Sequence, residues 1–213
     1  MPLSCIIFDC DGVILESVDA KAHAYARLAE PYGPEAVTRF SDYEIDHRGV
    51  SRYEKFMWFF REILNREITP EESRDWGERF IEYSDEAIGI SDFVPGFKDV
   101  LARWHGRVPL YVASGTPQRY LELILRDKGV ADSFARIFGT PPGKTGLVRA
   151  AVQDCGCAPG TCVMVGDSPI DLEAAIIVGT RFYGRGKRFA ESGHPWGVDL
   201  AGMNEYLETM AKE

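Results

Sequence analysis

The order of strand-like and helix-like segments is the feature that most constrains the fold of this 213-residue chain. After about residue 92, short apolar runs alternate with amphipathic segments, and this alternation predicts an α/β fold whose parallel sheet is covered by helices on both faces. The expected strands are Val108–Ala113, Ala135–Phe138, Thr161–Val165 and Thr180–Tyr183, and the expected helices between them are Gln118–Lys128, Thr145–Asp154 and Ile170–Val178.

One more apolar run, Ser4–Phe8, precedes this series and is separated from it by a long segment with helical patterns. Val18–Glu30 has helical spacing of Ala, Tyr and Leu, and Tyr53–Phe60 is a dense aromatic helix. Thr69–Glu72 is a typical helix start, with proline in the first turn and acids near the N-terminus. The pattern therefore predicts a core of residues 1–16 and 94–213, interrupted by a helical insertion of residues 17–93.

Composition excludes several classes of function. Hydrophobic residues make up 45% of the chain and aromatic residues 12%, which is ample for a packed core. The net charge of −9 argues against a broad basic surface, so neither nucleic acid nor an anionic membrane is an expected partner. No apolar stretch approaches the roughly 20 residues that span a bilayer.

Cysteine usage bears on the compartment. Five cysteines is an odd number in a chain too large to need disulfide staples, so reduced thiols and a cytoplasmic location are expected. Cys155, Cys157 and Cys162 are clustered, but no fourth cysteine or histidine nearby completes a zinc site, and small packing residues are the preferred interpretation. The first residues also lack a charged segment followed by an apolar one, so no signal peptide is expected.

The first chemical motif is Asp9-Cys10-Asp11-Gly12, directly after the opening apolar run. Alternate residues of a strand share a face, so Asp9 and Asp11 can point at one place. Two carboxylates there can act as nucleophile and proton carrier, and Gly12 permits a sharp turn of the chain. Taken alone, the motif is equally consistent with a strand that ends in a polar turn.

Two further polar positions follow later strands. Ser114, Gly115 and Thr116 end the strand that begins near Val108, and a hydroxyl with free N–H groups suits an oxyanion, although serine and threonine also cap helices. Lys144 follows a glycine- and proline-rich loop that lacks the P-loop spacing, so it is a single cation at a helix start or a solvated lysine.

The last motif is Gly166-Asp167-Ser168-Pro169-Ile170-Asp171, after the strand predicted at Thr161–Val165. Asp167 follows the strand, and Asp171 lies one helical turn further along the chain. Carboxylates at such a place suit a hard divalent cation. Asp167 and Ser168 can also cap the helix that Pro169 opens, and the two roles can coexist.

The four motifs together resemble those of the haloacid dehalogenase superfamily, in the same order and over essentially the whole chain. The resemblance implies a Rossmann-like core in which the strands of the first and fourth motifs are neighbours, and an inserted helical cap of the family's first type. Ligands would then bind at the carboxyl ends of the strands.

The resemblance also implies a mechanism. Asp9 would attack phosphorus to form an aspartyl-phosphate, and Asp11 would exchange protons with the leaving group and with water. Ser114 and Lys144 would hold the phosphoryl oxygens. The magnesium ligands implied by the family are Asp9, Asp11 (through its carbonyl), Asp167 and Asp171, the last directly or through water.

Differences between this sequence and the motifs of particular family members reduce the number of candidate functions. Haloacid dehalogenases proper lack the second aspartate, so Asp11 favours a phosphatase that acts on a small phosphorylated metabolite. The segment Arg48–Arg52 is similar to the substrate loop of β-phosphoglucomutases and raises a mutase alternative, but Lys21 stands where those enzymes carry histidine. A non-catalytic binding module is the third alternative, and it is disfavoured because each motif retains a competent residue.

The substrate contacts expected near the cap are Ser17, Lys21, Arg48, Arg52 and, from the core, Gly115. The roles of Glu16, His23 and His47 stay open, as do the identity of the substrate and the oligomeric state.

Overall fold

The computed structural model describes residues 2–212, except for the side chains of residues 85–87. Its strands are β1 (Cys5–Phe8), β2 (Leu110–Pro117), β3 (Arg136–Thr140), β4 (Cys162–Gly166), β5 (Arg181–Arg185) and β6 (Trp196–Gly197). Its α-helices are α1 (Val18–Ala29), α2 (Pro34–Asp46), α3 (Arg52–Glu62), α4 (Pro70–Ile90), α5 (Phe97–Trp104), α6 (Gln118–Asp127), α7 (Lys144–Cys155), α8 (Pro169–Val178) and α9 (Met203–Ala211). Short 3₁₀ turns occupy Glu30–Tyr32, Ala131–Ser133, Pro159–Thr161 and Lys187–Phe189.

The strands form one six-stranded sheet in the order β3-β2-β1-β4-β5-β6, and all its neighbouring strands are parallel. The opening strand β1 lies in the interior of the sheet, between β2 and β4. Phe8, its last residue, is in register with Val112 of β2 and Val165 of β4. The segments that follow β1, β2 and β4 therefore leave the same edge of the sheet, and this edge holds the polar motifs.

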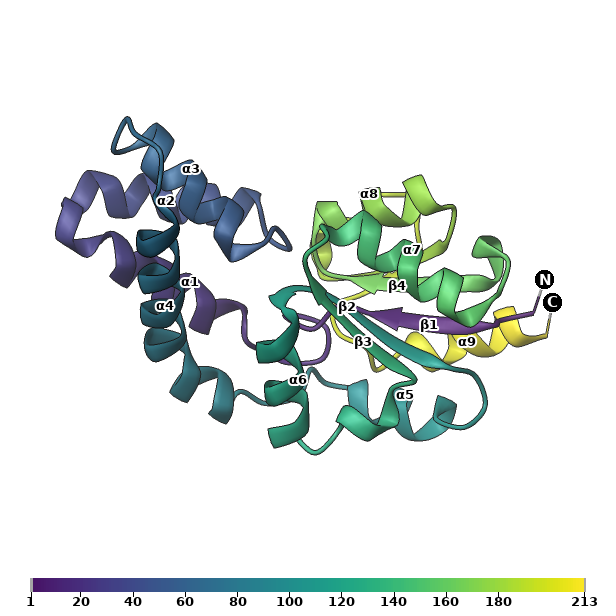
Figure 1. Cartoon of the computed structure of the whole chain (residues 1–213). Coiled ribbons are helices and arrows are strands. Elements are labelled where there is room, and N and C mark those ends of the chain that lie inside the picture. The colour runs from purple at the N-terminus through teal and green to yellow at the C-terminus, as the bar shows by residue number, and fades with distance from the viewer. Residues whose placement is uncertain (1, 213) are drawn as a thin grey trace.

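Helices cover both faces of the sheet, as the strand–helix alternation predicts (Figure 1). Ile6 and Phe8 belong to a buried cluster with residues of α5, α6 and α9, whereas Cys5 and Ile7 pack with residues of α7 and α8. This two-residue alternation is the pleat of a strand buried on both sides. The Rossmann-like α/β prediction is confirmed.

Helices α1–α4 form the helical cap, which stands beside the core and is inserted after β1 (Figure 1). A cluster of aromatic side chains fills its centre, including the fully buried Phe40, Phe56 and Phe80. The predicted start of α4 is confirmed by a capping box, in which Thr69 accepts a hydrogen bond from the Glu72 N–H and Glu72 accepts one from the Thr69 N–H.

The two chain segments that connect the cap to the core lie side by side. Leu15 forms an antiparallel bridge with Phe93, and the N–H of Glu16 donates to the carbonyl of Asp92 at 2.9 Å. A pair of adjacent connections is the arrangement a hinge requires. The exact division of the chain at 16/17 and 93/94 stays a prediction.

Several element bounds differ from those expected. Strand β2 runs to Pro117 rather than ending at Ala113, because it stays paired with β3 as far as Thr140 through a register shift between Ser114 and Pro117. The sequence did not indicate α5, α9 or β6. The two helices are short and rely on packing against the core for stability, and β6 is a two-residue strand paired with β5.

The prediction of reduced thiols was wrong for two cysteines. Cys155 and Cys157 form a disulfide bond, while Cys5, Cys10 and Cys162 are free and buried. Gly156 between the bonded pair adopts a left-handed conformation at the end of α7, and this turn brings the two Cα atoms to 5.3 Å.

Within the part of the chain that the structure describes, none of the helices combines the length and the hydrophobicity of a transmembrane segment.

Candidate active site

Asp9 leaves the end of β1 at the centre of the polar edge. Its N–H donates to the carbonyl of Val165 in β4 at 2.9 Å, which holds the residue against the neighbouring strand. The side chain is buried, and its Oδ1 forms an ion pair of 2.7 Å with the ammonium group of Lys144. The sheet thus places the first predicted carboxylate beside the isolated lysine.

Lys144 is the first residue of α7, and its ammonium group is enclosed by three oxygen atoms. It pairs with Asp9 at 2.7 Å and Asp171 at 2.9 Å, and it donates to the carbonyl of Ala113 at 2.8 Å. The side chain is almost fully buried, so the alternative of a solvated lysine is excluded. These contacts join the end of β1 and the middle of β2 to α8.

Asp167 follows β4, and Asp171 lies in the first turn of α8. One carboxylate oxygen of Asp171 accepts hydrogen bonds from the N–H and the hydroxyl of Ser168, at 3.1 and 2.6 Å, as part of a capping box. Ligand atoms of Asp9, Asp167 and Asp171 lie within 4.8 Å of one another, and all three residues are buried. The structure therefore contains a buried acidic cluster where the sequence predicts a metal.

Burial and mutual repulsion disfavour the ionised forms of two carboxylates in the acidic cluster. Burial raises the pKa of Asp9 to about 7, and although Lys144 acts in the opposite direction, the neighbouring Asp171 and Asp11 add to the increase. Burial, with the charges of Asp171 and Asp9, raises the pKa of Asp167 to about 8. Carboxylates whose ionisation is opposed by burial and by one another, and that offer only oxygen atoms, fit a hard divalent cation.

The carboxylate of Asp11 points to the cap rather than to the acidic cluster. Its Oδ1 accepts a hydrogen bond of 2.6 Å from Ser17, and its Oδ2 accepts from Lys21 and, at 3.2 Å, from the hydroxyl of Thr116. Burial opposes ionisation, but Lys21 and the two hydroxyl groups outweigh it and lower the pKa of Asp11. Asp9 and Asp11 thus have opposite pKa shifts, because Asp11 has Lys21 to itself whereas Asp9 shares Lys144 with Asp171.

Two glycines permit close approach at this site. Gly12 has φ +73°, and a Cβ atom there would lie 2.4 Å from Oδ2 of Asp167. A Cβ on Gly115 would lie 2.4 Å from the carbonyl oxygen of Gly49, which belongs to the cap. The first contact brings the two motifs together, and the second lets the cap close on the core.

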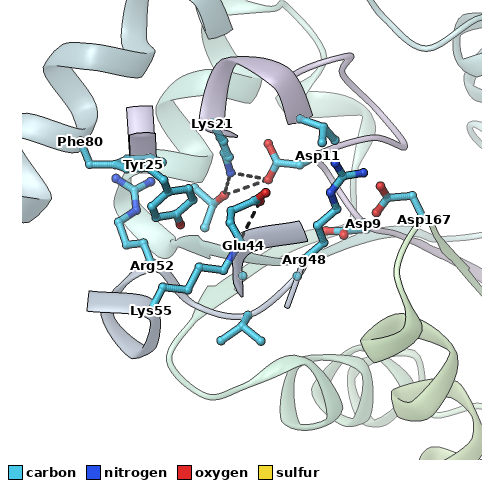
Figure 2. A pocket seen from close by; sticks show the side chains of 15 residues that line it. Asp9, Asp11, Lys21, Tyr25, Glu44, Arg48, Arg52, Lys55, Phe80 and Asp167 are labelled. Atoms are coloured by element: carbon cyan, nitrogen blue, oxygen red, sulfur yellow. Dashed lines mark hydrogen bonds and ion pairs between the residues drawn. The ribbon is translucent and has the colours of Figure 1, made fainter. Parts of the chain in front are cut away.

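A cavity of about 50 Å³ lies between cap and core (Figure 2). Of the predicted site residues, those that line it are Asp9, Asp11, Lys21, Arg48, Arg52, Gly115 and Asp167. Ser17, Ser114 and Lys144 lie behind this lining and contact it: Ser17 donates to Asp11, the Ser114 hydroxyl oxygen accepts from the Thr116 N–H, and Lys144 pairs with Asp9. Asp171 lies one step further back and pairs with Lys144. The four motifs, distant in sequence, therefore meet at one cavity.

The comparison with protein families gives a match that covers most of the chain. A model described as haloacid dehalogenase-like hydrolase matches residues 3–179. The chain belongs to this family of hydrolases. A comparison with curated protein sequences finds no significant match.

Solved structures of similar fold cover nearly the whole hydrolase. A β-phosphoglucomutase from Clostridium difficile superposes with a TM-score of 0.82 at 19% identity, over 99% of this chain and 97% of the other. A protein described as a predicted phosphoglycolate phosphatase from Haemophilus somnus gives 0.74 at 20% identity, over 96% and 97%. CbbY from Rhodobacter sphaeroides, in complex with phosphate, gives 0.74 at 19% identity, over 94% and 96%. At such identities these similarities establish the fold alone.

Sequence reasoning missed several residues of the hydrolase cavity. Thr116 bridges Lys21 and Asp11, and its position in the motif after Ser114 was the one available signal. Tyr25, Glu44, Lys55 and Phe80 also line the cavity. They come from all four cap helices, and no local pattern indicates that these helices turn the four side chains to one place.

The three residues with open roles lie outside the cavity lining. Glu16 pairs with Arg185 at 2.6 Å, which connects the segment just before the cap to β5. His23 is exposed on α1, and His47 stacks on Tyr43 with its Nδ1 2.8 Å from the carbonyl of that residue.

Proposed function

We propose that this hydrolase is a magnesium-dependent phosphatase that cleaves a small phosphorylated metabolite through an aspartyl-phosphate on Asp9. One observation carries the proposal: the buried carboxylate of Asp9 is held by Lys144 at one side of the cavity between cap and core, and the carboxylate of Asp11 lines the same cavity. A nucleophile and a separate acid–base group are what hydrolysis through a covalent intermediate requires.

The charges of the site support a divalent cation. Four carboxylates (Asp9, Asp11, Asp167 and Asp171) face two ammonium groups (Lys21 and Lys144), which leaves two negative charges uncompensated. Two like charges about 4 Å apart repel by on the order of 4 kcal/mol at an effective dielectric of 20. A bound Mg²⁺ would supply the missing charge and polarise the phosphoryl group.

The four carboxylates would contribute unequally to holding Mg²⁺. We assign Asp9, Asp167 and the backbone carbonyl of Asp11 as the ligands, because the Asp11 carboxylate is engaged by Lys21 and Ser17. Asp171 already accepts from Ser168 and pairs with Lys144, so it would act through water or by orienting its neighbours.

The chemical steps use residues on the two sides of the cavity. Both described contacts of the Asp9 carboxylate, from Lys144 and from the Cys10 N–H, go to Oδ1, so Oδ2 would attack phosphorus. The ester P–O bond breaks as Asp11 delivers a proton to the leaving oxygen. Asp11 then removes a proton from water, which attacks the phosphorus, and phosphate leaves with Asp9 regenerated.

Ser114, Gly115 and Lys144 are placed to hold the transferring phosphoryl group. The hydroxyl oxygen of Ser114 accepts a hydrogen bond from the Thr116 N–H at 3.2 Å, so its own proton is free for a phosphoryl oxygen. Gly115 brings its backbone to the cavity, and Lys144 supplies a fixed positive charge beside Asp9. Such preorganised donors stabilise the charge that develops during transfer.

The cap, which we place at residues 17–93, would close over the bound substrate. A cavity of about 50 Å³ is far smaller than the roughly 300 to 1,000 Å³ of small-molecule sites, and we infer that cap and core separate to admit substrate. Lys21, Arg48 and Arg52 face the cavity from the cap and would contact the substrate, while Ser17 would act through its bond to Asp11.

A sugar-phosphate mutase is the alternative, and it is favoured by the position of Arg48 at the cavity and by the similarity in fold to a β-phosphoglucomutase. A mutase would need a bisphosphorylated activator and would release little phosphate. Rapid release of inorganic phosphate from a sugar monophosphate would therefore exclude it.

The test is a phosphate-release screen across phosphorylated metabolites with Mg²⁺, with the Asp9→Asn protein as the blank. We expect the wild-type protein to release phosphate and the variant to lose at least about a thousandfold in rate while unfolding at a similar temperature. Equal rates in the two proteins, or full activity after exhaustive chelation, would refute the proposal. A binding module would show no turnover in either protein.

A further inference from the structure

Three charged side chains of the cap line the cavity on the side away from Asp9 and Asp167. Glu44 of α2 and Arg52 and Lys55 of α3 are each at most 4% exposed, and we call them the distal subsite. Figure 2 shows Arg52 and Lys55 on the opposite side of the view from Asp9 and Asp167, with Glu44 between the two groups. None of the chemical steps above uses Glu44 or Lys55.

The hydrogen-bonding capacity of the distal subsite is incompletely used. Lys55 reaches Oε1 of Glu44 at a long 3.4 Å, and among the described residues Oε2 of Glu44 has no hydrogen-bond partner although it is buried. Nη2 of Arg52 is likewise buried without a hydrogen-bond partner. Buried polar groups in native proteins are nearly always satisfied, so these atoms indicate a missing ligand.

Aromatic rings hold the distal subsite in place. The guanidinium group of Arg52 lies 4.4 Å from the centre of the Phe80 ring, and the ammonium group of Lys55 lies 4.8 Å from that of Tyr25. Rings attract the two cations without satisfying their N–H donors. The donors therefore stay oriented and available to an acceptor in the cavity.

A purely structural role for the Glu44–Lys55 pair explains less. A buried ion pair rarely stabilises a fold more than apolar residues of similar size would, and this pair is long and leaves a carboxylate oxygen unsatisfied. Recognition of a ligand accounts for both the burial and the unsatisfied atoms, because a bound group would supply the partners.

The chemistry of the missing ligand follows from the three side chains. Oε2 of Glu44 needs a hydrogen-bond donor, whereas Arg52 and Lys55 need acceptors. Two cations against one carboxylate leave a single positive charge, which one carboxylate of a ligand would balance. A hydroxyl group next to a carboxylate meets all of these requirements.

We propose, on the basis of the phosphatase function above, that Glu44, Arg52 and Lys55 recognise the leaving group of a phosphorylated hydroxy acid. The free hydroxyl donates to Glu44, and the carboxylate accepts from Arg52 and Lys55. Specificity then depends on both groups, since a substrate without the hydroxyl leaves Glu44 unpaired and one without the carboxylate leaves a buried positive charge.

The test compares four substrates with the Mg²⁺-loaded wild-type protein. 3-Phosphoglycerate has both groups, glycerol 3-phosphate has hydroxyls alone, phosphoglycolate has the carboxylate alone, and p-nitrophenyl phosphate has neither. Among the three alkyl phosphates we expect kcat/KM to be highest for 3-phosphoglycerate, by about tenfold or more over each of the other two, while p-nitrophenyl phosphate reports catalysis without either group. A higher value for phosphoglycolate or glycerol 3-phosphate, whose alkoxide leaving groups match that of 3-phosphoglycerate, would overturn the proposal, and this ranking needs no variant.

Two variants separate the roles within the subsite. Glu44→Gln should reduce kcat/KM for 3-phosphoglycerate and glycerol 3-phosphate, which carry a hydroxyl, about tenfold more than for phosphoglycolate. Lys55→Met should reduce kcat/KM for 3-phosphoglycerate and phosphoglycolate, which carry a carboxylate, about tenfold more than for glycerol 3-phosphate. Equal losses on all substrates would show a structural role and contradict the proposal. Glu54→Gln, on the exposed side of α3, is the matched control.

Failure of this inference is distinguishable from failure of the phosphatase function. If p-nitrophenyl phosphate is hydrolysed in an Asp9-dependent manner but the three alkyl phosphates show the wrong ranking, the subsite assignment is wrong and the catalytic one stands. If no substrate is hydrolysed in an Asp9-dependent manner, the catalytic proposal itself fails.

Discussion

The ammonium group of Lys21, on the first cap helix, donates a hydrogen bond to the carboxylate of Asp11 in the core. Lys21 also donates to Thr116 at the end of β2, so one cap side chain contacts two core segments of the cavity. The position of the cap is thereby coupled to the protonation of the proposed acid–base group, because Lys21 lowers the pKa of Asp11.

Replacement of Lys21 should shift the pH dependence of turnover. Lys21→Met removes the positive charge beside Asp11, so the pKa of Asp11 should rise toward or above its ordinary value. Asp11 must be protonated when the leaving group departs and ionised when water attacks. Any limb of the pH–rate profile that depends on the ionisation of Asp11 should therefore move to higher pH. Phosphate release measured from about pH 5 to pH 9 tests this. Lys21→Arg, which keeps the charge, should shift the profile less, and an unchanged profile in Lys21→Met would contradict the coupling.

Metal binding should stabilise the protein more at high pH. The metal-free fold raises the pKa of Asp9 to about 7 and that of Asp167 to about 8, both above the value of 3.8 for an unperturbed aspartate. Their contribution to stability is therefore present below about pH 4 and is lost as pH rises through 7 to 8, when buried carboxylates must ionise. Mg²⁺ reverses this loss by binding the ionised form.

Thermal unfolding at several pH values measures the effect. The increase in Tm on addition of Mg²⁺ should grow between about pH 5 and pH 8. Asp167→Asn should abolish most of that growth. If Mg²⁺ raises Tm by the same amount at the low and the high end of this pH range, protons and Mg²⁺ do not compete for the carboxylates of this cluster.

Loss of Lys144 should destabilise the fold as well as stop turnover. Its ammonium group neutralises Asp9 and Asp171 and satisfies the carbonyl of Ala113. Removal of one partner from a buried pair typically costs about 3 to 5 kcal/mol. Lys144→Met should therefore lower the midpoint of urea unfolding in the metal-free protein, and Mg²⁺ should restore part of the stability. The exposed Lys187→Met is the control, and an unaltered midpoint for Lys144→Met would show that the charge is dispensable.

A methyl group on Gly115 should prevent full closure of the cap. The added Cβ would lie 2.4 Å from the carbonyl oxygen of Gly49, which is backbone and cannot rotate away. Displacement of the cap by about 1 Å is enough to cost on the order of a hundredfold in rate, so Gly115→Ala should reduce kcat/KM by roughly that factor with little change in Tm. Gly202→Ala, where no atom lies within 4 Å, is the matched control. Wild-type kinetics in Gly115→Ala would mean that cap and core do not meet here during turnover.

Local sequence patterns predict the parts of this protein that are determined by near neighbours in the chain. The apolar run that became β1 and the capping box at Thr69 are such cases. The bounds of β2 were not predictable, because its last residues stay in the sheet through pairing with β3. The disulfide between Cys155 and Cys157 was also missed, since it depends on the conformation of the turn at Gly156.

The sequence by itself determined which chemical groups are present and which strand or helix end carries each of them, because strand and helix periodicities are local properties of the chain. Only the tertiary structure decided which of these ends meet. Asp9 and Asp167 lie together because β1 and β4 are adjacent in the sheet, and Glu44, Arg52 and Lys55 share a cavity because two cap helices pack against each other with these faces turned to the core. These contacts between distant residues depend on the burial of apolar surface across the whole molecule, which no short segment encodes.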